Sequence, residues 1–339
     1  MRTGLAGAAI IPLVVGLSCG STSSETVDRA LGEPAASTAA REAVVDPIDD
    51  GTGTSVTPTT TAAPEPTVPV RAFNGRAVPN APRSAEEASA AFTRTVSQLR
   101  RDETDPALWP DLGHELQLTV RMLSRNPEWH EAFLAGLPLE LRRVADLHLQ
   151  ARAELGSLHT APPLTEIPAW EIIDPLPIEA LLGHYEAAEE AAGIAWEVLA
   201  AINLIETGMG RIDGLSSAGA QGPMQFLPST WEEVSEGGDI DDPADAIPGA
   251  ARYLVRRGGL DDIRAGLWGY NNSDNYVNAV LAYVEILEEE PKDLRGLHGW
   301  EIYVGTEAGT LWLPVGFRTE EPLDAHTYLA KNPWAITIR

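Results

Sequence analysis

Apolar residues recur at helical spacing through much of the chain beyond residue 84. One set is Phe92, Val96 and Leu99, and two comparable sets follow before Leu155. Side chains three or four positions apart lie on one face of an α-helix, so each set forms an apolar stripe that another element must cover. The spacing predicts a small helical module over residues 84–170, with a packing or positioning role.

A proline-rich stretch, residues 162–177, leads from this module to a second helical region over residues 171–290. Ser229 and Glu232 form a capping box, and Asp245 is a candidate N-cap for the helix that follows. The helices expected here cover residues 196–207, a helix from Ser229 that Gly237-Gly238 closes, and residues 245–257, 262–268 and 274–289.

The pattern changes from helical spacing to alternation after Pro291. Trp300, Ile302 and Val304 alternate with other residues, and a second apolar run, residues 310–315, follows a short connection. A period of two is typical of strands, so it predicts a β-hairpin within a C-terminal segment, residues 291–339. The expected fold class is therefore mainly α, with a short β-hairpin segment at the C-terminal end.

The chain begins in the manner of an exported protein. Met1-Arg2 precedes an apolar run that is too short to span a bilayer and is typical of a secretory signal peptide over residues 1–18. Cys19 follows directly, in a sequence that resembles the processing site of a bacterial lipoprotein, whose cysteine receives lipid. We expect a protein of the cell envelope, anchored outside the cytoplasm through Cys19; secretion without an anchor is the alternative.

Residues 19–83 are rich in Thr, Ser, Pro, Ala and acidic residues. A segment of this composition does not bury enough apolar surface to offset the entropy of ordering its backbone. We expect a disordered tether between the anchor and the folded part of the chain.

The overall charge and the rarity of cysteine exclude several classes of partner and cofactor. A net charge of −26 and a pI near 4.5 argue against nucleic acid, which requires clustered Lys and Arg. With a single cysteine, the chain forms no internal disulfide and no Cys-rich metal site. The histidines lack zinc-ligand spacing, and the acidic turn 239–242 lacks the glycine and glutamate of a calcium loop. No metal and no cofactor are expected.

Glu206 is the first candidate for chemistry. It lies near the end of the apolar helix expected over residues 196–207, and Val198, Leu199 and Ile202 share its face. Partial burial and the negative end of the helix dipole both disfavour the ionised carboxylate, so the pKa is expected to rise toward that of a general acid. On position alone, a surface glutamate is the simpler alternative.

Several motifs around and after Glu206 favour a catalytic acid over a surface glutamate, because their order and spacing together match one family. The motifs are Ile205-Glu206-Thr207, Ser216-Ser217-Ala218-Gly219-Ala220, Gly222-Pro223-Met224-Gln225-Phe226, Pro228-Ser229-Thr230-Trp231, Ala246 to Tyr253 and Gly269-Tyr270-Asn271. They resemble the peptidoglycan lytic transglycosylases of the soluble-transglycosylase (SLT) type, which have a lysozyme-like fold. The resemblance covers about Pro177 to Glu289. Thr207 replaces a serine and Pro223 replaces a leucine of the usual pattern, which leaves fine specificity open.

The resemblance implies roles for particular residues. Glu206 is similar to the family's single acid/base, and Tyr270 to the tyrosine that orients it. The residues that the resemblance places at the glycan are Ser216, Met224, Gln225, Tyr270 and Asn271. The implied reaction cleaves the β-1,4 bond between N-acetylmuramic acid and N-acetylglucosamine without water and leaves 1,6-anhydromuramyl ends. The implied fold is a lysozyme-like helical catalytic domain over residues 171–290.

Two other interpretations stay open at this stage. The chain could be a catalytically inactive lipoprotein that binds peptidoglycan glycan strands, or a lysozyme-type hydrolase that uses Asp213 or a nearby acid as a second carboxylate. The mass of the released sugars separates hydrolysis from transglycosylation. The sequence does not indicate protein partners.

Overall fold

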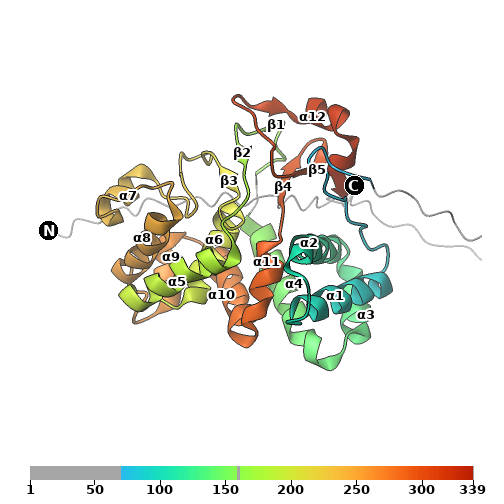
Figure 1. The fold of residues 1–339 in the computed structure, drawn as a ribbon, viewed down its shortest axis with the longest axis horizontal. Helices are drawn as coiled ribbons and strands as arrows, with labels where there is room; N and C mark the ends of the chain where they lie inside the picture. The colour runs from blue at the N-terminus through green and yellow to red at the C-terminus, as the bar shows by residue number, and fades with distance from the viewer. Residues whose placement is uncertain (1–69, 159–160, 339) are drawn as a thin grey trace, which may run out of the picture. The chain divides into compact units, whose positions relative to one another are not determined.

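The apolar stripes of the helical module are buried between four helices. In the computed structural model, which describes residues 70–158 and 161–338, the module consists of α1 (Ala85–Leu99), α2 (Trp109–Arg125), α3 (His130–Gly136) and α4 (Arg142–Leu158). Phe92, Val96 and Leu99 are all buried, as their spacing predicts. Ser84 caps α1, because its side chain accepts a hydrogen bond from the Glu87 N–H. The helical module is confirmed (Figure 1).

A second group of helices follows in sequence and joins the first through one long helix. Its members are α5 (Ile178–Ala192), α6 (Trp196–Thr207), α7 (Pro228–Val234), α8 (Pro243–Arg256), α9 (Ile263–Tyr270), α10 (Asp274–Glu289) and α11 (Leu294–His298). α10 packs against α4 on one side and against α6 on the other (Figure 1). The apolar side chains of both groups form one continuous core. The prediction of a mainly helical fold is therefore confirmed.

Two of the predicted helix starts are wrong. α7 begins at Pro228 after Leu227, which offers no side-chain cap, so Ser229 lies inside the helix. α8 is capped by Asp242, whose side chain accepts from the Ala244 N–H, three residues before the predicted cap Asp245. In both cases a proline occupies the first turn, where its fixed φ suits the helix and its missing N–H costs nothing.

Within the described part of the chain, the strands form three small antiparallel sheets. The largest has the order β4 (Ile302–Thr306), β5 (Gly309–Leu313) and β7 (Ile336–Ile338). In it, Ile302 pairs with Leu313 and Thr306 with Gly309, which confirms the predicted hairpin. The other sheets pair β1 (Glu166–Ile167) with β6 (Leu323–Asp324), and β2 (Glu171–Ile172) with β3 (Ile212–Asp213); α12 (Ala325–Lys331) follows β6.

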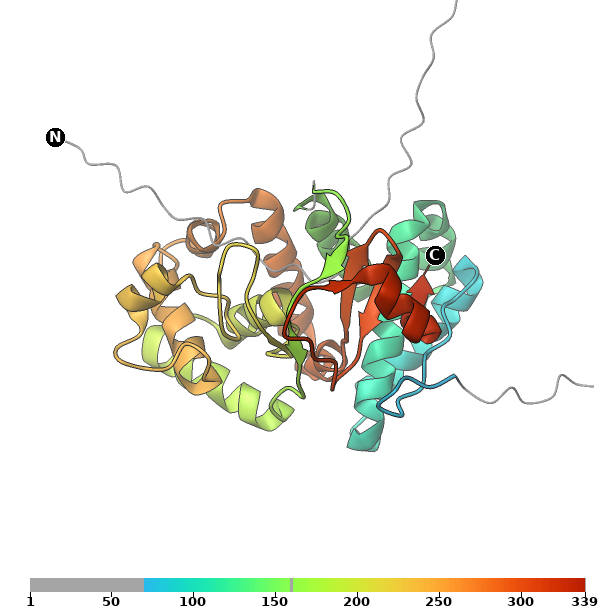
Figure 2. The same cartoon turned by 90° about the horizontal axis from the view of Figure 1, so that it is seen from above.

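The segment between the two helical groups runs alongside the C-terminal segment (Figure 2). The Ile172 N–H donates to the Phe317 carbonyl, and the Thr319 N–H donates to the Trp170 carbonyl. Trp170 and Ile172, which lie at the predicted domain boundary, thus both form hydrogen bonds with the C-terminal segment. The described residues all belong to one compact unit.

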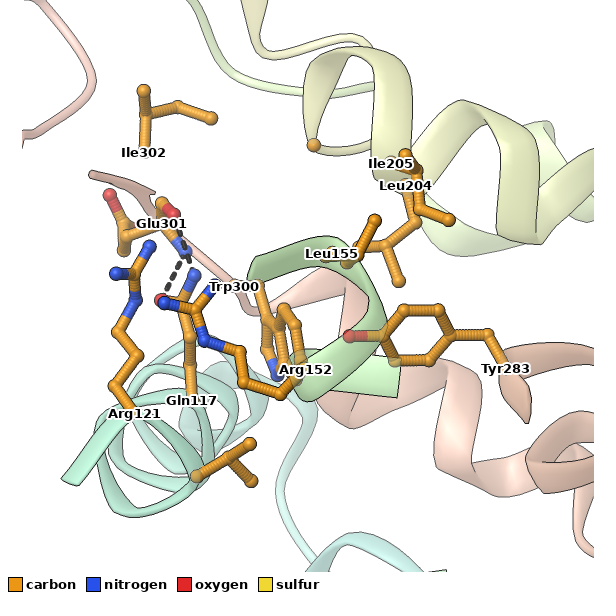
Figure 3. Close-up of a pocket in the computed structure, with 12 residues that line it drawn as sticks. Gln117, Arg121, Arg152, Leu155, Leu204, Ile205, Tyr283, Trp300, Glu301 and Ile302 are labelled. Atoms are coloured by element: carbon orange, nitrogen blue, oxygen red, sulfur yellow. Dashed lines mark hydrogen bonds between the residues drawn. The ribbon is translucent and has the colours of Figure 1, made fainter. Parts of the chain in front are cut away.

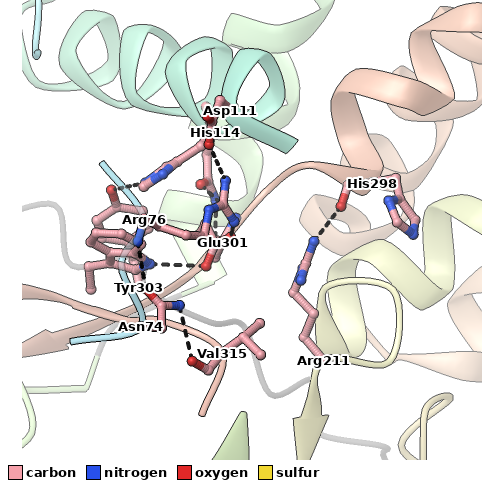
Figure 4. Close-up of polar contacts among 11 residues, drawn as sticks. Asn74, Arg76, Asp111, His114, Arg211, His298, Glu301, Tyr303 and Val315 are labelled. Atoms are coloured by element: carbon pink, nitrogen blue, oxygen red, sulfur yellow. Dashed lines mark hydrogen bonds and ion pairs between the residues drawn. The ribbon is translucent and has the colours of Figure 1, made fainter. Parts of the chain in front are cut away.

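Residues 70–83 also pack on the folded part, although the sequence assigns them to the tether. Arg76 forms ion pairs with Glu301 and Asp111, and the Asn74 side-chain amide donates to the Val315 carbonyl at 3.1 Å (Figure 4). Ala72 is buried beside the rings of Tyr303 and Trp312. The prediction of a tether rests on the composition of residues 19–83 alone. It does not include the ion pair that Arg76 forms with Glu301, a residue far away in the sequence.

The remaining predictions for the N-terminal part concern residues outside those that the structure describes. These are the signal peptide over residues 1–18, the lipid site at Cys19 and the tether up to residue 69. Among residues 70–158 and 161–338, no helix has both the length and the apolar content that a bilayer crossing requires.

Candidate active site

Glu206 lies in the most buried helix around the site. Ten consecutive residues of α6, Val198 to Thr207, are buried, and Glu206 itself has 0% of its surface exposed. One carboxyl oxygen, Oε1, accepts a hydrogen bond from the Tyr276 hydroxyl at 2.8 Å. The other oxygen, Oε2, is buried and has no hydrogen-bond partner among the described residues. Oε2 is therefore the carboxyl oxygen that no described protein group holds.

Burial gives Glu206 the ionisation behaviour of a general acid. Desolvation raises the pKa of Glu206 from 4.5 to about 8, while the hydrogen bond from Tyr276 acts in the opposite direction and is the smaller effect. The carboxyl therefore holds its proton near neutral pH. This result agrees with the pKa rise that the apolar helix predicts and excludes the surface glutamate alternative.

The tyrosine that contacts the acid differs from the one that the family resemblance implies. Tyr270, at the end of α9, donates its hydroxyl to the Met224 carbonyl at 2.7 Å and so holds the loop that follows the acid. Tyr276, in the first turns of α10, is the residue that reaches Glu206. The two rings are parallel, with centroids 6.4 Å apart. Tyr276 becomes accessible to the acid because α10 packs against α6.

We expect Tyr276→Phe to lower any activity that depends on Glu206 by roughly ten- to a hundredfold, the range for a lost hydrogen bond to a charged group. Because the hydroxyl lowers the pKa of Glu206, its removal should raise that pKa above about 8. The alkaline limb of the pH–rate profile should then move to higher pH. Tyr270→Phe is the matched control: it should leave the alkaline limb in place, and equal displacement in both variants would contradict a positioning role for Tyr276.

The loop over residues 215–226 is closed by its own polar groups. The Ser216 Oγ accepts hydrogen bonds from the N–H groups of Ala218 and Ala220, at 3.2 and 2.9 Å. The Gln221 and Phe226 backbones pair at the other end, and the Phe226 ring is buried against Trp231 and Tyr270. Ser216 thus shapes the loop, and no hydrogen bond between Ser216 and Glu206 occurs among the described residues.

Asn203 and Thr207, two polar residues of α6, attach this loop to the helix that carries Glu206. The Asn203 side-chain amide and the Thr207 hydroxyl both donate to the Pro223 carbonyl, at 2.8 and 2.7 Å. The Tyr185 hydroxyl in turn donates to Asn203 Oδ1 at 2.7 Å. Asn203 and Thr207 are polar residues within the buried part of α6, Val198 to Thr207, and a polar residue at a buried position is the sequence signal for such a contact. Thr207 stands where the family pattern has a serine. Both residues carry a hydroxyl, so the substitution keeps the hydrogen bond to the Pro223 carbonyl.

Gly222 fixes how closely the loop approaches the turn before α8. Its φ is +70°, and a Cβ at this position would lie 1.9 Å from the Ile240 carbonyl oxygen. Gly219 has a similar φ of +79°, but a Cβ there meets nothing within 4 Å. The two glycines are therefore matched in backbone conformation and differ in surroundings.

We expect Gly222→Ala to displace the loop and to lower activity at least tenfold, because the clash is with backbone. Gly219→Ala should cost about 1–2 kcal/mol of stability, the strain of a left-handed non-glycine residue, and should keep most of its activity. Urea melts measure the loss of stability, and an assay of the activity that depends on Glu206 measures the loss of function. Equal loss of activity in the two variants would show that loop strain, not the contact with Ile240, controls the site.

The remaining predicted glycan residues are buried. Met224 and Gln225 have no exposed surface, and Gln225 adopts a φ of +50° with its Oε1 buried and without a partner among the described residues. Asn271 ends α9 and is also buried. Trp268 in α9 is by contrast 48% exposed.

Asp213, the alternative second carboxylate, lies at the end of β3 opposite Glu171. Burial first, and then the charges of Asp239 and Asp213, raise the pKa of Asp241. Neither Asp213 nor any other described acid is a cause of the raised pKa of Glu206. Glu206 therefore stands apart from the other described carboxylates in its electrostatic environment. The described residues hold no group of three or more His, Cys, Asp or Glu side chains arranged for a metal ion.

The part of the chain that contains Glu206 matches a known protein family. Residues 184–291 match the model of the transglycosylase SLT domain. The match begins within α5 and ends just after α10, so it includes Glu206, the loop over residues 215–226 and Tyr276. The match agrees with the family resemblance seen in the motifs and with a lysozyme-like helical domain. The search of curated proteins gave no match, and the search of solved structures also gave none.

Proposed function

We propose that this protein is a peptidoglycan lytic transglycosylase that cleaves the bond between N-acetylmuramic acid and N-acetylglucosamine with Glu206 as its single acid/base. The SLT domain match implies peptidoglycan as the substrate. The observation that carries the mechanism is the environment of Glu206: a fully buried carboxyl with a pKa of about 8, held by one tyrosine hydroxyl. Such a group is protonated and shielded from bulk water before the reaction starts.

The reaction needs one proton donor that later acts as a base. Glu206 gives its proton to the glycosidic oxygen as the bond from that oxygen to C1 of the muramic acid breaks. The resulting carboxylate takes the proton of the C6 hydroxyl of the same sugar, and O6 bonds to C1 to close the 1,6-anhydro ring. The Tyr276 hydroxyl, 2.8 Å from Oε1, stabilises the carboxylate between the two steps. Glu206 ends protonated, as it began.

The surroundings of Glu206 favour this reaction over hydrolysis. A hydrolase of the usual kind needs a second carboxylate beside the same sugar. Glu206 accepts its hydrogen bond from the Tyr276 hydroxyl, and no other described acid is a cause of its raised pKa. The test is the mass of the fragments that the purified protein releases from cell wall: anhydro ends support transglycosylation, and fragments that are each heavier by one water would establish hydrolysis.

We also propose that the enzyme acts from the outer face of the membrane, anchored by lipid on Cys19. The proposal rests on the apolar run before Cys19 and on the sequence Leu17-Ser18-Cys19-Gly20. Expression with a radiolabelled fatty acid should label the wild-type chain and leave Cys19→Ala unlabelled. Label in both chains, or in neither, would contradict the anchor.

A further inference from the structure

Three consecutive carbonyl groups of the loop over residues 215–226 accept hydrogen bonds from buried side chains. The carbonyls are those of Gly222, Pro223 and Met224, and the donors are, in the same order, Gln225, then Asn203 with Thr207, then Tyr270. Each of these donor residues has 0% of its surface exposed. Side chains of α6 and α9 therefore help to set the position of this part of the loop.

Asn203 uses both ends of its side-chain amide in this contact. Its Nδ2 donates to the Pro223 carbonyl at 2.8 Å, and its Oδ1 accepts from the Tyr185 hydroxyl of α5 at 2.7 Å. A carbonyl only accepts, so Pro223 fixes the orientation of the amide. Tyr185 is also fully buried, so bulk water does not replace either partner. A single side chain thus links α5, α6 and the loop.

Another side of α6 is less tightly packed. Leu204 and Ile205 line a cavity of about 50 Å³ between α6 and the helical module, which Figure 3 shows in close-up. That volume exceeds the space that one water needs. Because packing on this side leaves α6 room to shift, the hydrogen bonds on the loop side carry more of its alignment with the loop.

The turn that Asn203 holds contains a strained residue. Gln225 has a φ of +50°, in the left-handed region that residues other than glycine seldom adopt. Strain of this kind persists where surrounding contacts impose it, and it is common at ligand sites. The Gln225 Oε1 is buried and has no hydrogen-bond partner among the described residues. A ligand with an N–H or O–H group can supply the partner that this acceptor lacks.

We propose that Asn203 is a positioning residue: by holding the Pro223 carbonyl, it sets where the turn of residues 222–225 lies relative to Glu206. The inference rests on the proposed function, because the glycan has to meet both the acid and this turn. No hydrogen bond joins Asn203 to Glu206 or Tyr276 among the described residues. Loss of the Asn203 contact should therefore weaken glycan binding and leave the alkaline limb of the pH–rate profile in place.

The test compares Asn203→Leu, which keeps the size of the side chain and loses its hydrogen bonds, with Leu287→Ala. Leu287 is a buried residue of α10 outside the site, so its truncation lowers stability alone. We expect Asn203→Leu to raise KM for purified glycan strands roughly tenfold, the range for a lost hydrogen bond between buried groups. Leu287→Ala should keep the wild-type KM. An equal rise in both variants would assign the effect to lost stability and overturn the proposal.

Thr207 donates to the same carbonyl and gives a second test. Thr207→Val keeps the shape of the side chain and removes the hydroxyl, so KM should rise as in Asn203→Leu. Thr207→Ser keeps the hydroxyl and should behave as wild type. A normal KM in Thr207→Val would contradict the role of the Pro223 carbonyl.

Hydrogen exchange of the loop amides needs no substrate, so it tests the contact separately from the proposed function. The Gln225 and Phe226 N–H groups bond within the loop. In Asn203→Leu they should exchange roughly tenfold faster than in wild type, while the amides of α10 keep their protection. Unchanged loop exchange would overturn the proposal even if glycan is cleaved. If wild type cleaves no glycan, the proposed function fails, and faster loop exchange in the variant would then mark the Asn203 contact as purely structural.

Discussion

Glu206→Gln should lower the release of glycan fragments by about 10²- to 10⁴-fold, the range for loss of a general acid/base. Glutamine has the shape of a protonated glutamate and can accept the hydrogen bond from Tyr276, so the fold should persist. It carries no transferable acid proton for the glycosidic oxygen and cannot accept the proton of the C6 hydroxyl. Both steps of the proposed reaction fail together.

Glu197→Gln is the matched control, because Glu197 lies in the first turn of the same helix and has no proposed role. It should retain nearly full activity. Binding to purified cell wall, measured by co-sedimentation, should persist in wild type and in both variants. If wild type and Glu206→Gln were equally inert but bound the wall, the inactive wall-binding lipoprotein would be the correct interpretation. Equal activity of the two would remove Glu206 from the mechanism.

Most of the helical scaffold can be predicted because it follows from apolar spacing. α6 and α10 occupy the residues that the pattern indicates, since each has a long apolar face and a clear start or end. Helix starts are less predictable, because Pro228 and Pro243 compete with the serine and aspartate signals nearby. A side chain that can cap does so only if the backbone begins its first turn there.

The sequence identifies Glu206 as the candidate acid, but it does not identify all the residues that contact Glu206. Glu206 follows from an acid on an apolar stripe, together with the motifs around it. The choice between Tyr270 and Tyr276 depends on how α10 approaches α6, which is a tertiary feature that spacing within one helix does not contain. The hydrogen bonds from Asn203 and Thr207 to the Pro223 carbonyl likewise depend on how the loop folds back against α6, which is also a tertiary feature.

The burial of Glu206 should make the protein less stable as the pH rises from about 4.5 to about 8. The folded-state pKa is about 8, against an ordinary value of 4.5. Below 4.5 the carboxyl is protonated in both states and has no effect on their balance. Between the two values the unfolded chain releases its proton while the folded protein keeps it, so the free energy of unfolding falls. Above about 8 both states are ionised and the loss is complete.

Glu206→Gln isolates this effect, because an amide does not titrate. At about 1.4 kcal/mol per pKa unit, the loss amounts to a few kcal/mol in wild type and is absent in the variant. Urea unfolding at pH 4, 6 and 8 should therefore show the variant gaining stability relative to wild type at each step. Asp241 and Asp293, whose pKa values burial also raises, are present in both proteins and cancel in the difference. A difference that did not change with pH would mean that the carboxyl is hydrated in the folded protein, and water would then be available to compete with the C6 hydroxyl.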